Sequence, residues 1–283
     1  MSINNQRIFA ISDVHIDYAA NFTLLEEISN FDYLNDSLIV AGDATDDLNK
    51  LQALFDCLQK KFKHVFFVPG NHELWLRKDS FENSLDKFEA IIETCSARSV
   101  FTEPKLIGAT WVVPLFSWYV GPEGGKNSLF LPKPGEDKTH EMWSDFFLTR
   151  FPEGYSIASL FMEKNNAALN IPYSGKIVSF SHFLPRPELI FPSVEMYRFA
   201  LEGFKKGQML GMDPTPGFNF SRVAGSWQID QQLRQIGSKL HVYGHQHRNR
   251  DLVIDDVRYI SHCLGYPKER ARQFPTSLLK QVD

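Results

Sequence analysis

The feature that most constrains the fold is a repeated pattern in the first third of the chain, where each short apolar run ends in a polar cluster. Residues 7–12, 37–41 and 64–68 are predicted to be buried strands, and they end in DVHIDY, GDATDD and PGNHE. Between them, residues 22–30 look helical and residues 46–62 carry apolar side chains at helical spacing. Alternation of strand, polar loop and helix is typical of a mostly parallel sheet that is covered by helices.

The same pattern returns further along the chain. Residues 176–181 and 239–243 are predicted strands, and they end in HFLP and GHQH. Residues 105–116 and 251–262 have the alternation expected of a hairpin or a strand pair. Polar clusters therefore follow strands in both halves of the sequence.

Two long segments lack this regularity. Residues 117–172 hold many aromatic side chains, and residues 187–226 are rich in Gly and Pro. No repeat or linker divides the chain, so we expect residues 1–283 to form one domain with an aromatic-rich excursion at 117–172. The aromatic rings of the excursion could line a substrate pocket or form a small satellite core. Because the excursion leaves the sheet between the polar clusters GNHE and SH, we predict that it lies beside the site and sets substrate choice.

The composition argues against several classes of function. The chain has 283 residues and a net charge of −4, which gives no electrostatic footprint for nonspecific binding to nucleic acid. Neither a signal peptide nor a run of about 20 apolar residues, as a membrane span needs, is found in the sequence. Cys57, Cys95 and Cys263 are scattered and odd in number, which favours a reducing compartment. We therefore expect a cytoplasmic protein.

The polar clusters contain the residue types that bind metal ions. In open α/β sheets, ligands bind at the carboxyl ends of the strands, so side chains that follow separate strands can meet at one edge. The D-x-H and H-x-H spacings also place alternate residues on the same side of an extended backbone. Oxygen and nitrogen ligands without cysteine suit Mn, Fe or Zn, and Mg is a further option. The candidates are Asp13, His15, Asp43, Asn71, His72, His182, His245 and His247.

Each cluster also has an ordinary structural explanation. Gly-Asp at a strand end is usually a turn or a helix N-cap, and a single His after a strand, such as His182, is more often structural. The Gly and Asn of GNHE are residues that turns favour, but a turn does not explain His72. The structural explanation weakens when all the clusters are taken together, each after its own strand.

The series D-V-H, G-D-A-T-D, G-N-H-E, S-H and G-H-Q-H resembles the five-block signature of the calcineurin-like metallophosphoesterases. It spans residues 13–247 and no block is missing. The resemblance implies an α/β fold, a four-layer αββα arrangement in which a β-sandwich is flanked by helices. It also implies a dinuclear metal site at the carboxyl ends of the strands. The implied activity is hydrolysis of a small intracellular phosphomonoester or phosphodiester by a metal-bridging hydroxide.

The resemblance also assigns roles to individual residues. It implies two divalent or trivalent metal ions, one held by Asp13, His15 and His247, the other by Asn71, His182 and His245, with Asp43 bridging both. It further implies that His72 is the catalytic histidine and that Asp46 is the carboxylate that orients it. Arg186 is a candidate for contact with a substrate phosphate, because a guanidinium can bind one bidentately; solvated surface charge is the alternative.

Other functions stay open at this stage. Nucleases that act on DNA or RNA share the same blocks, although the acidic net charge disfavours a nucleic acid partner. A non-catalytic, metal-stabilised interaction module would be expected to have lost some motif residues. A phosphatase acting on proteins typically has an Arg-Gly extension after its Gly-Asp block, where this chain has GDATDDL. We expect a small phosphorylated substrate and no membrane partner, and the sequence predicts no oligomeric state.

Overall fold

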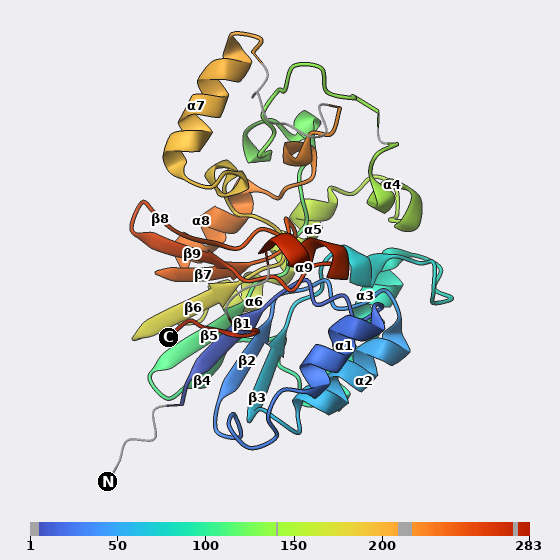
Figure 1. The fold of residues 1–283 in the computed structure, drawn as a ribbon, viewed down its shortest axis with the longest axis vertical. Coiled ribbons are helices and arrows are strands. Elements are labelled where there is room, and N and C mark those ends of the chain that lie inside the picture. The colour runs from blue at the N-terminus through green and yellow to red at the C-terminus, as the bar shows by residue number, and fades with distance from the viewer. Residues whose placement is uncertain (1–5, 140, 209–216, 274–276) are drawn as a thin grey trace.

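The computed structural model describes residues 6–139, 141–208, 217–273 and 277–283, which build two β-sheets and the helices around them (Figure 1). The first sheet has the strand order β10-β1-β2-β3. Its strands are β1 (Ile8–Ile11), β2 (Ser37–Val40), β3 (His64–Phe67) and β10 (Lys280–Gln281). Strands β1, β2 and β3 are parallel, and the short β10 pairs antiparallel with β1.

The second sheet has the strand order β4-β5-β6-β7-β9-β8. Its strands are β4 (Lys105–Ile107), β5 (Thr110–Pro114), β6 (Lys176–Phe180), β7 (Leu240–Tyr243), β8 (Arg250–Ile254) and β9 (Val257–Ser261). The central strands β5, β6, β7 and β9 are parallel, and the edge strands β4 and β8 each form a hairpin with their neighbour. The hairpins predicted at 105–116 and 251–262 are therefore confirmed.

The two sheets pack face to face with helices outside them. Buried side chains of both sheets, including Phe66, Phe180 and Ile260, form the apolar layer between the sheets. The helices α1 (Ala19–Glu26), α2 (Leu48–Leu58) and α3 (Ser84–Ala97) cover the outer face of the first sheet. The helices α6 (Asn166–Leu169) and α8 (Trp227–Gln235) contribute to a second core against the other sheet. This arrangement confirms the predicted sandwich flanked by helices; its reading as one domain stays a prediction.

Much of the described part of the two irregular segments lies above the carboxyl ends of the strands, whereas α6 packs against the second sheet (Figure 1). The two segments also contain η2 (Pro122–Asn127), α4 (Ser144–Leu148), α5 (Ile157–Lys164), η3 (Pro187–Ile190), α7 (Val194–Lys205) and η4 (Phe220–Arg222). The ring of Trp143 lies 4.6 Å from that of Phe218, and Glu136 pairs with Arg222. These contacts tie the aromatic excursion to the second irregular segment. None of the helices described has the length and apolar character that a membrane crossing requires.

Candidate metal centre

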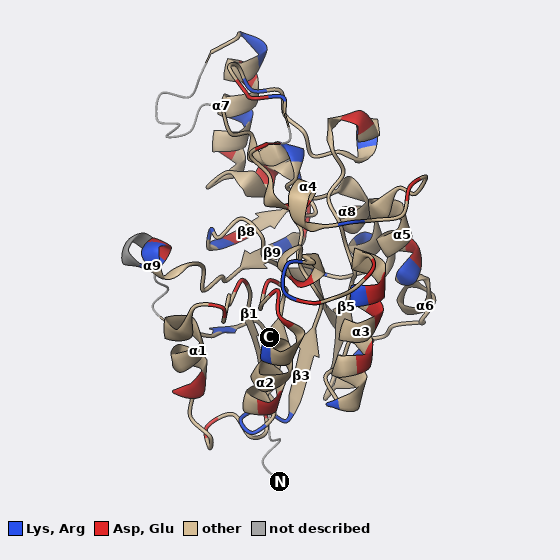
Figure 2. Cartoon of the chain, turned by 90° about the vertical axis from the view of Figure 1, so that its right-hand side faces the viewer, with Lys and Arg blue, Asp and Glu red and all other residues tan. Residues whose placement is uncertain are grey.

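The predicted ligands converge at the carboxyl ends of strands from both sheets. The potential ligand atoms of Asp13, His15, Asp43 and His247 all lie within 4.8 Å of one another, and so do those of Asp43, His182 and His245. Asp43 belongs to both groups, as a bridging carboxylate would. Figure 2 shows acidic segments at these strand ends, above β1. The structure therefore brings the residues together, while their role as ligands stays a prediction.

The first group has two imidazole nitrogens that face each other. His15 Nε2 lies 2.9 Å from His247 Nε2, and His247 Nε2 lies 3.4 Å from Asp13 Oδ1. In the second group, His182 Nε2 lies 3.3 Å from Asp43 Oδ1 and 3.2 Å from Asn71 Oδ1. Asn71 was predicted with this group, and its amide oxygen is directed into it. Lone-pair atoms of both groups thus point at common positions, as they do around a metal ion.

Three of the histidines hold their other ring nitrogen against an oxygen of the protein. The pairs are His182 Nδ1 with Ala41 O at 2.9 Å, His245 Nε2 with Val223 O at 3.0 Å, and His247 Nδ1 with Glu269 Oε2 at 2.8 Å. Metal-binding histidines usually have such a partner, because it fixes the ring and the tautomer. Each ring therefore keeps one nitrogen for the group that it faces.

The backbone at the site is in a conformation that few residues adopt. Five of the predicted ligands have positive φ angles: Asp13 (52°), His15 (40°), Asp43 (54°), His245 (74°) and His247 (53°). Each such residue costs on the order of 1–3 kcal/mol and persists only where the surroundings fix it. Asp and His tolerate this region better than most residues. The concentration of strain in one place indicates a functional site.

Glycines make room for the ligands. A Cβ at Gly42 would lie 2.5 Å from His182 Nδ1, and the φ angle of Gly42 is +78°. A Cβ at Gly70 would overlap Asp43 Oδ1. The Gly of the GDATD block and the Gly of the GNHE block are therefore explained by close approach to the second group.

Glu73 fixes the loop that carries Asp43, a role that the sequence analysis missed. This carboxylate is 1% exposed and accepts four backbone N–H groups. The donors are Asp43 at 3.0 Å, Ala44 at 2.5 Å, Thr45 at 3.0 Å and Gly70 at 2.6 Å. Burial and the nearby Asp43 charge raise the pKa of Glu73 to about 7, although two of these hydrogen bonds oppose the shift. The last residue of GNHE thus joins two of the motif loops.

The carboxylates and imidazoles of the site shift one another's pKa values. Burial alone would raise the pKa of Asp13, but His247 lowers it to about 2. Burial alone would likewise raise the pKa of Asp43, but His182 and His72 hold it well below its usual value. Against the effect of burial, Asp43 raises the pKa of His182 to about 9, and Asp13 with Glu269 raises that of His247 to about 10. A metal ion would take the place of these protons, so the donor set fits the predicted ions.

The predicted catalytic residue His72 lies at the edge of this centre. Its Nε2 is 3.8 Å from Asp43 Oδ2 and 3.5 Å from the Tyr266 hydroxyl. Its ring packs against Trp75 with the centroids 3.6 Å apart. Burial lowers the pKa of His72, so the free imidazole is mainly neutral at neutral pH.

Asp46, which was predicted to orient His72, has a different partner in the structure. The Asp46 carboxylate is buried and pairs with Arg77, and no contact with His72 is among the described ones. Arg77 lies over the Trp75 ring, so Asp46 is linked to His72 only indirectly, and its orienting role stays a prediction.

Arg186 does not lie among the residues of the metal centre. It is 7% exposed, and its guanidinium pairs with Glu188, Asp230 and Asp255 at 2.8, 3.6 and 2.9 Å. It also lies over the ring of Trp227. These three carboxylates give Arg186 a structural role in the described residues, and its predicted contact with a substrate phosphate stays a prediction.

A cleft of about 290 Å³ opens over the centre. Trp143 and Asp145 of the excursion line it together with Tyr266 and the predicted ligands. The excursion therefore lies beside the site, as predicted. Trp118 belongs instead to a small aromatic core, the alternative role predicted for these rings. It is 5% exposed and packs against Phe151, Phe161 and Phe183.

Three residues that no sequence pattern predicted also contact the centre: Asp145, Tyr266 and Glu269. Asp145 Oδ1 accepts hydrogen bonds from Asn71 Nδ2 at 2.8 Å and Trp75 Nε1 at 2.7 Å. Tyr266 packs against the rings of both His15 and His247, with centroid distances of 4.6 and 4.8 Å. Glu269 lies on α9 (Pro267–Gln273), which is outside the motif blocks. None of these residues belongs to a recognisable motif.

The site consists of two adjacent carboxylate–histidine groups that share one aspartate, and it lies at the strand ends of a β-sandwich. This arrangement defines the dinuclear phosphoesterase class. A family model described as calcineurin-like phosphoesterase matches residues 6–249, and the chain belongs to this family. The chain is therefore a hydrolase that acts on phosphoric ester bonds with the help of bound metal.

Two comparisons with individual proteins extend this result. The chain is 27% identical to the [acyl-carrier-protein] phosphodiesterase PptH of Mycobacterium tuberculosis, over 97% of this chain and 82% of the relative. It also resembles the crystal structure of phosphopantetheinyl hydrolase (PptH) from the same organism, with a TM-score of 0.68 and 24% identity. That structural match covers 98% of this chain and 95% of the other, and supports the fold.

Proposed function

We propose that this chain hydrolyses the phosphodiester that joins a pantetheinyl arm to a serine of a carrier protein. The support is the relative at 27% identity, whose name states a phosphodiesterase activity on acyl carrier protein. The proposed substrate is thus a modified protein rather than the small phosphorylated molecule that the sequence suggested. The oxygen of water joins phosphorus, the bond from phosphorus to the serine oxygen breaks, and a proton returns to that oxygen.

The observation that carries the proposal is the pair of ligand groups that share Asp43. We assign Asp13, His15 and His247 to one ion and Asn71, His182 and His245 to the other. Two bound ions would supply Lewis acidity and lower the pKa of a water molecule. Mn, Fe or Zn suits this donor set, with Mg as a further option.

The residues around the centre would position the phosphate. His72 is placed to donate an N–H to a phosphoryl or leaving oxygen, because its Nε2 lies beside Asp43 at the edge of the centre. Burial and the Asp43 charge raise the pKa of the Tyr266 hydroxyl, so it stays protonated and is a second donor. The carboxylates of Asp13 and Asp43 hold the charge that offsets the ions.

The experiment is a substrate panel. The purified chain is loaded separately with Mn, Zn, Fe or Mg and assayed on carrier protein bearing the arm, bis-p-nitrophenyl phosphate, p-nitrophenyl phosphate and an oligonucleotide. We expect release of phosphopantetheine from the carrier protein and faster cleavage of the diester than of the monoester. Cleavage of the oligonucleotide alone would overturn the proposal in favour of a nuclease.

We also propose a cytoplasmic location. Cys57, Cys95 and Cys263 are all free thiols, which is usual in a reducing compartment. Cell fractionation tests this proposal, and recovery of the chain outside the cytoplasm would contradict it.

A further inference from the structure

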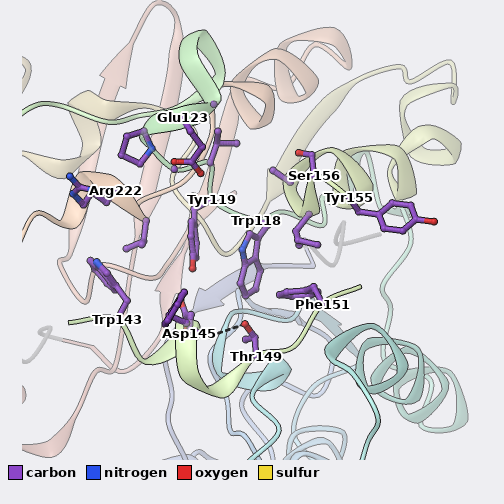
Figure 3. Close-up of a pocket in the computed structure, with 18 residues that line it drawn as sticks. Trp118, Tyr119, Glu123, Trp143, Asp145, Thr149, Phe151, Tyr155, Ser156 and Arg222 are labelled. Atoms are coloured by element: carbon purple, nitrogen blue, oxygen red, sulfur yellow. Dashed lines mark hydrogen bonds between the residues drawn. The ribbon is translucent and has the colours of Figure 1, made fainter. Parts of the chain in front are cut away.

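A second cavity, which we call the side cavity, lies next to the cleft over the metal centre. Its volume is about 570 Å³, within the usual range for pockets that hold a small organic molecule. Its walls include Trp118, Tyr119, Phe151, Tyr155 and Val223 (Figure 3). All four of these aromatic rings come from the excursion 117–172.

The side cavity and the cleft share part of their walls. Trp143 and Asp145 line both. Asp145 is also hydrogen-bonded to Asn71, a proposed ligand, and Figure 3 shows the hydroxyl of Tyr119 directed toward Asp145. A substrate whose phosphate lies at the centre could therefore extend past Asp145 into the side cavity.

The walls suit a long, uncharged group with a few polar atoms. Aromatic and aliphatic side chains make up most of the surface, with two carboxylates, from Glu123 and Asp145, and one guanidinium from Arg222. The Tyr119 hydroxyl stays protonated, because burial and Asp145 raise its pKa well above the usual value. A pantetheinyl arm has this character, since it carries two methyl groups, a hydroxyl and two amides but no charge of its own.

A stacked nucleobase fits the side cavity less well. The ring of Trp118 already packs against Tyr119, Phe151 and Phe161, with centroids 5.1, 5.3 and 6.1 Å apart. With only 5% of its surface exposed, Trp118 forms a wall rather than a platform for a base. We propose that the side cavity binds the pantetheinyl arm of the substrate, an inference that rests on the proposed function for the identity of the arm.

Thr149 offers a matched pair of variants that tests this assignment. Its side chain lines the side cavity, and its hydroxyl donates to the backbone oxygen of Asp145 at 2.7 Å. Thr149→Trp fills the side cavity and removes this hydrogen bond, whereas Thr149→Val removes the hydrogen bond and keeps the space. Glu123→Trp approaches from the exposed wall, with Glu123→Gln as its control, in case Thr149→Trp does not fold.

Two measurements are made on each variant in the full-length chain. The first is the affinity for pantetheine, the arm without phosphate, by calorimetry. The second is the ratio of kcat/KM for arm-bearing carrier protein to that for bis-p-nitrophenyl phosphate. We expect the pantetheine affinity and the kcat/KM ratio of each Trp variant to fall about tenfold or more, which is the range for the loss of apolar contacts in a pocket. Each control variant should stay close to the wild type.

The two measurements distinguish the proposed binding of the arm in the side cavity from the proposed hydrolysis of the diester. Pantetheine binding that the Trp variants abolish supports the side cavity, even if the wild type hydrolyses no diester and the proposed function fails. Three results would overturn the assignment and leave the proposed hydrolysis standing. They are equal pantetheine affinity in the wild type and the Trp variants, no measurable pantetheine affinity in the wild type, and an unchanged kcat/KM ratio.

Discussion

Asp145 links the aromatic excursion to the metal centre, and replacing it should weaken one metal position more than the other. Asp145 Oδ1 accepts hydrogen bonds from Asn71 Nδ2 and Trp75 Nε1. Asp145→Ala removes the oxygen that accepts both hydrogen bonds and leaves two buried donors unpaired. At about 1–3 kcal/mol for each, the free energy of unfolding of the metal-free protein should fall by about 2–6 kcal/mol.

The same change frees the Asn71 amide to rotate away from the second group. Loss of a residue that orients a metal ligand typically costs about 10–100-fold in affinity. We therefore expect this loss at the position of His182 and His245, with little change at the position of His15 and His247. Asp145→Asn is the matched control, because its amide oxygen can keep both hydrogen bonds.

Chelator competition measures the two metal affinities, and urea unfolding measures the stability. We expect the affinities of the two metal positions to differ more in Asp145→Ala than in Asp145→Asn. If Asp145→Ala binds both ions as tightly as the wild type, the carboxylate does not position Asn71. An equal loss at both positions would indicate general damage to the fold instead.

Further predictions concern His72, Asp46 and the protons of the site. His72→Ala should keep both ions and lower kcat by about 10²-fold or more, whereas loss of an ion would make His72 a ligand. Asp46→Asn should lower kcat less, and an effect as large as that of His72→Ala would rule out an indirect role. His182 and His247, with pKa values raised to about 9 and about 10, carry protons at pH 7 that metal must displace. Metal affinity should therefore rise with pH over this range, with about two protons released per chain at pH 7 in calorimetry; affinity that falls with pH would contradict this.

The strands and the motif residues at their ends could be predicted from the sequence because both signals are local. Apolar runs such as residues 37–41 mark buried strands, and Asp43 follows directly in the sequence. The predicted ligands meet because parallel strands end at one edge, a rule that needs no knowledge of the loops.

Residues that reach the centre from elsewhere carry no such signal. Asp145 arrives from an excursion without periodicity, and Glu269 arrives from a helix whose charges resemble a solvated face. Helix α7 was also missed, because it lies in a segment without a regular pattern; its apolar residues share one face, yet Phe199 on it is 65% exposed. The partners of Arg186 were hidden because Asp230 and Asp255 lie far from it in the sequence.

The most direct test of the account is the number of metal ions per chain in the wild type and in Asp43→Asn. Asp43 is the one residue common to both ligand groups of the described structure. After reconstitution and removal of free metal, elemental analysis should find two ions in the wild type, with hydrolysis lost on chelation and restored by metal. Asp43→Asn should weaken both positions at once and lose most activity. A fully active wild type with at most one ion, or an Asp43→Asn variant with two tightly bound ions and undiminished hydrolysis, would contradict the shared dinuclear site.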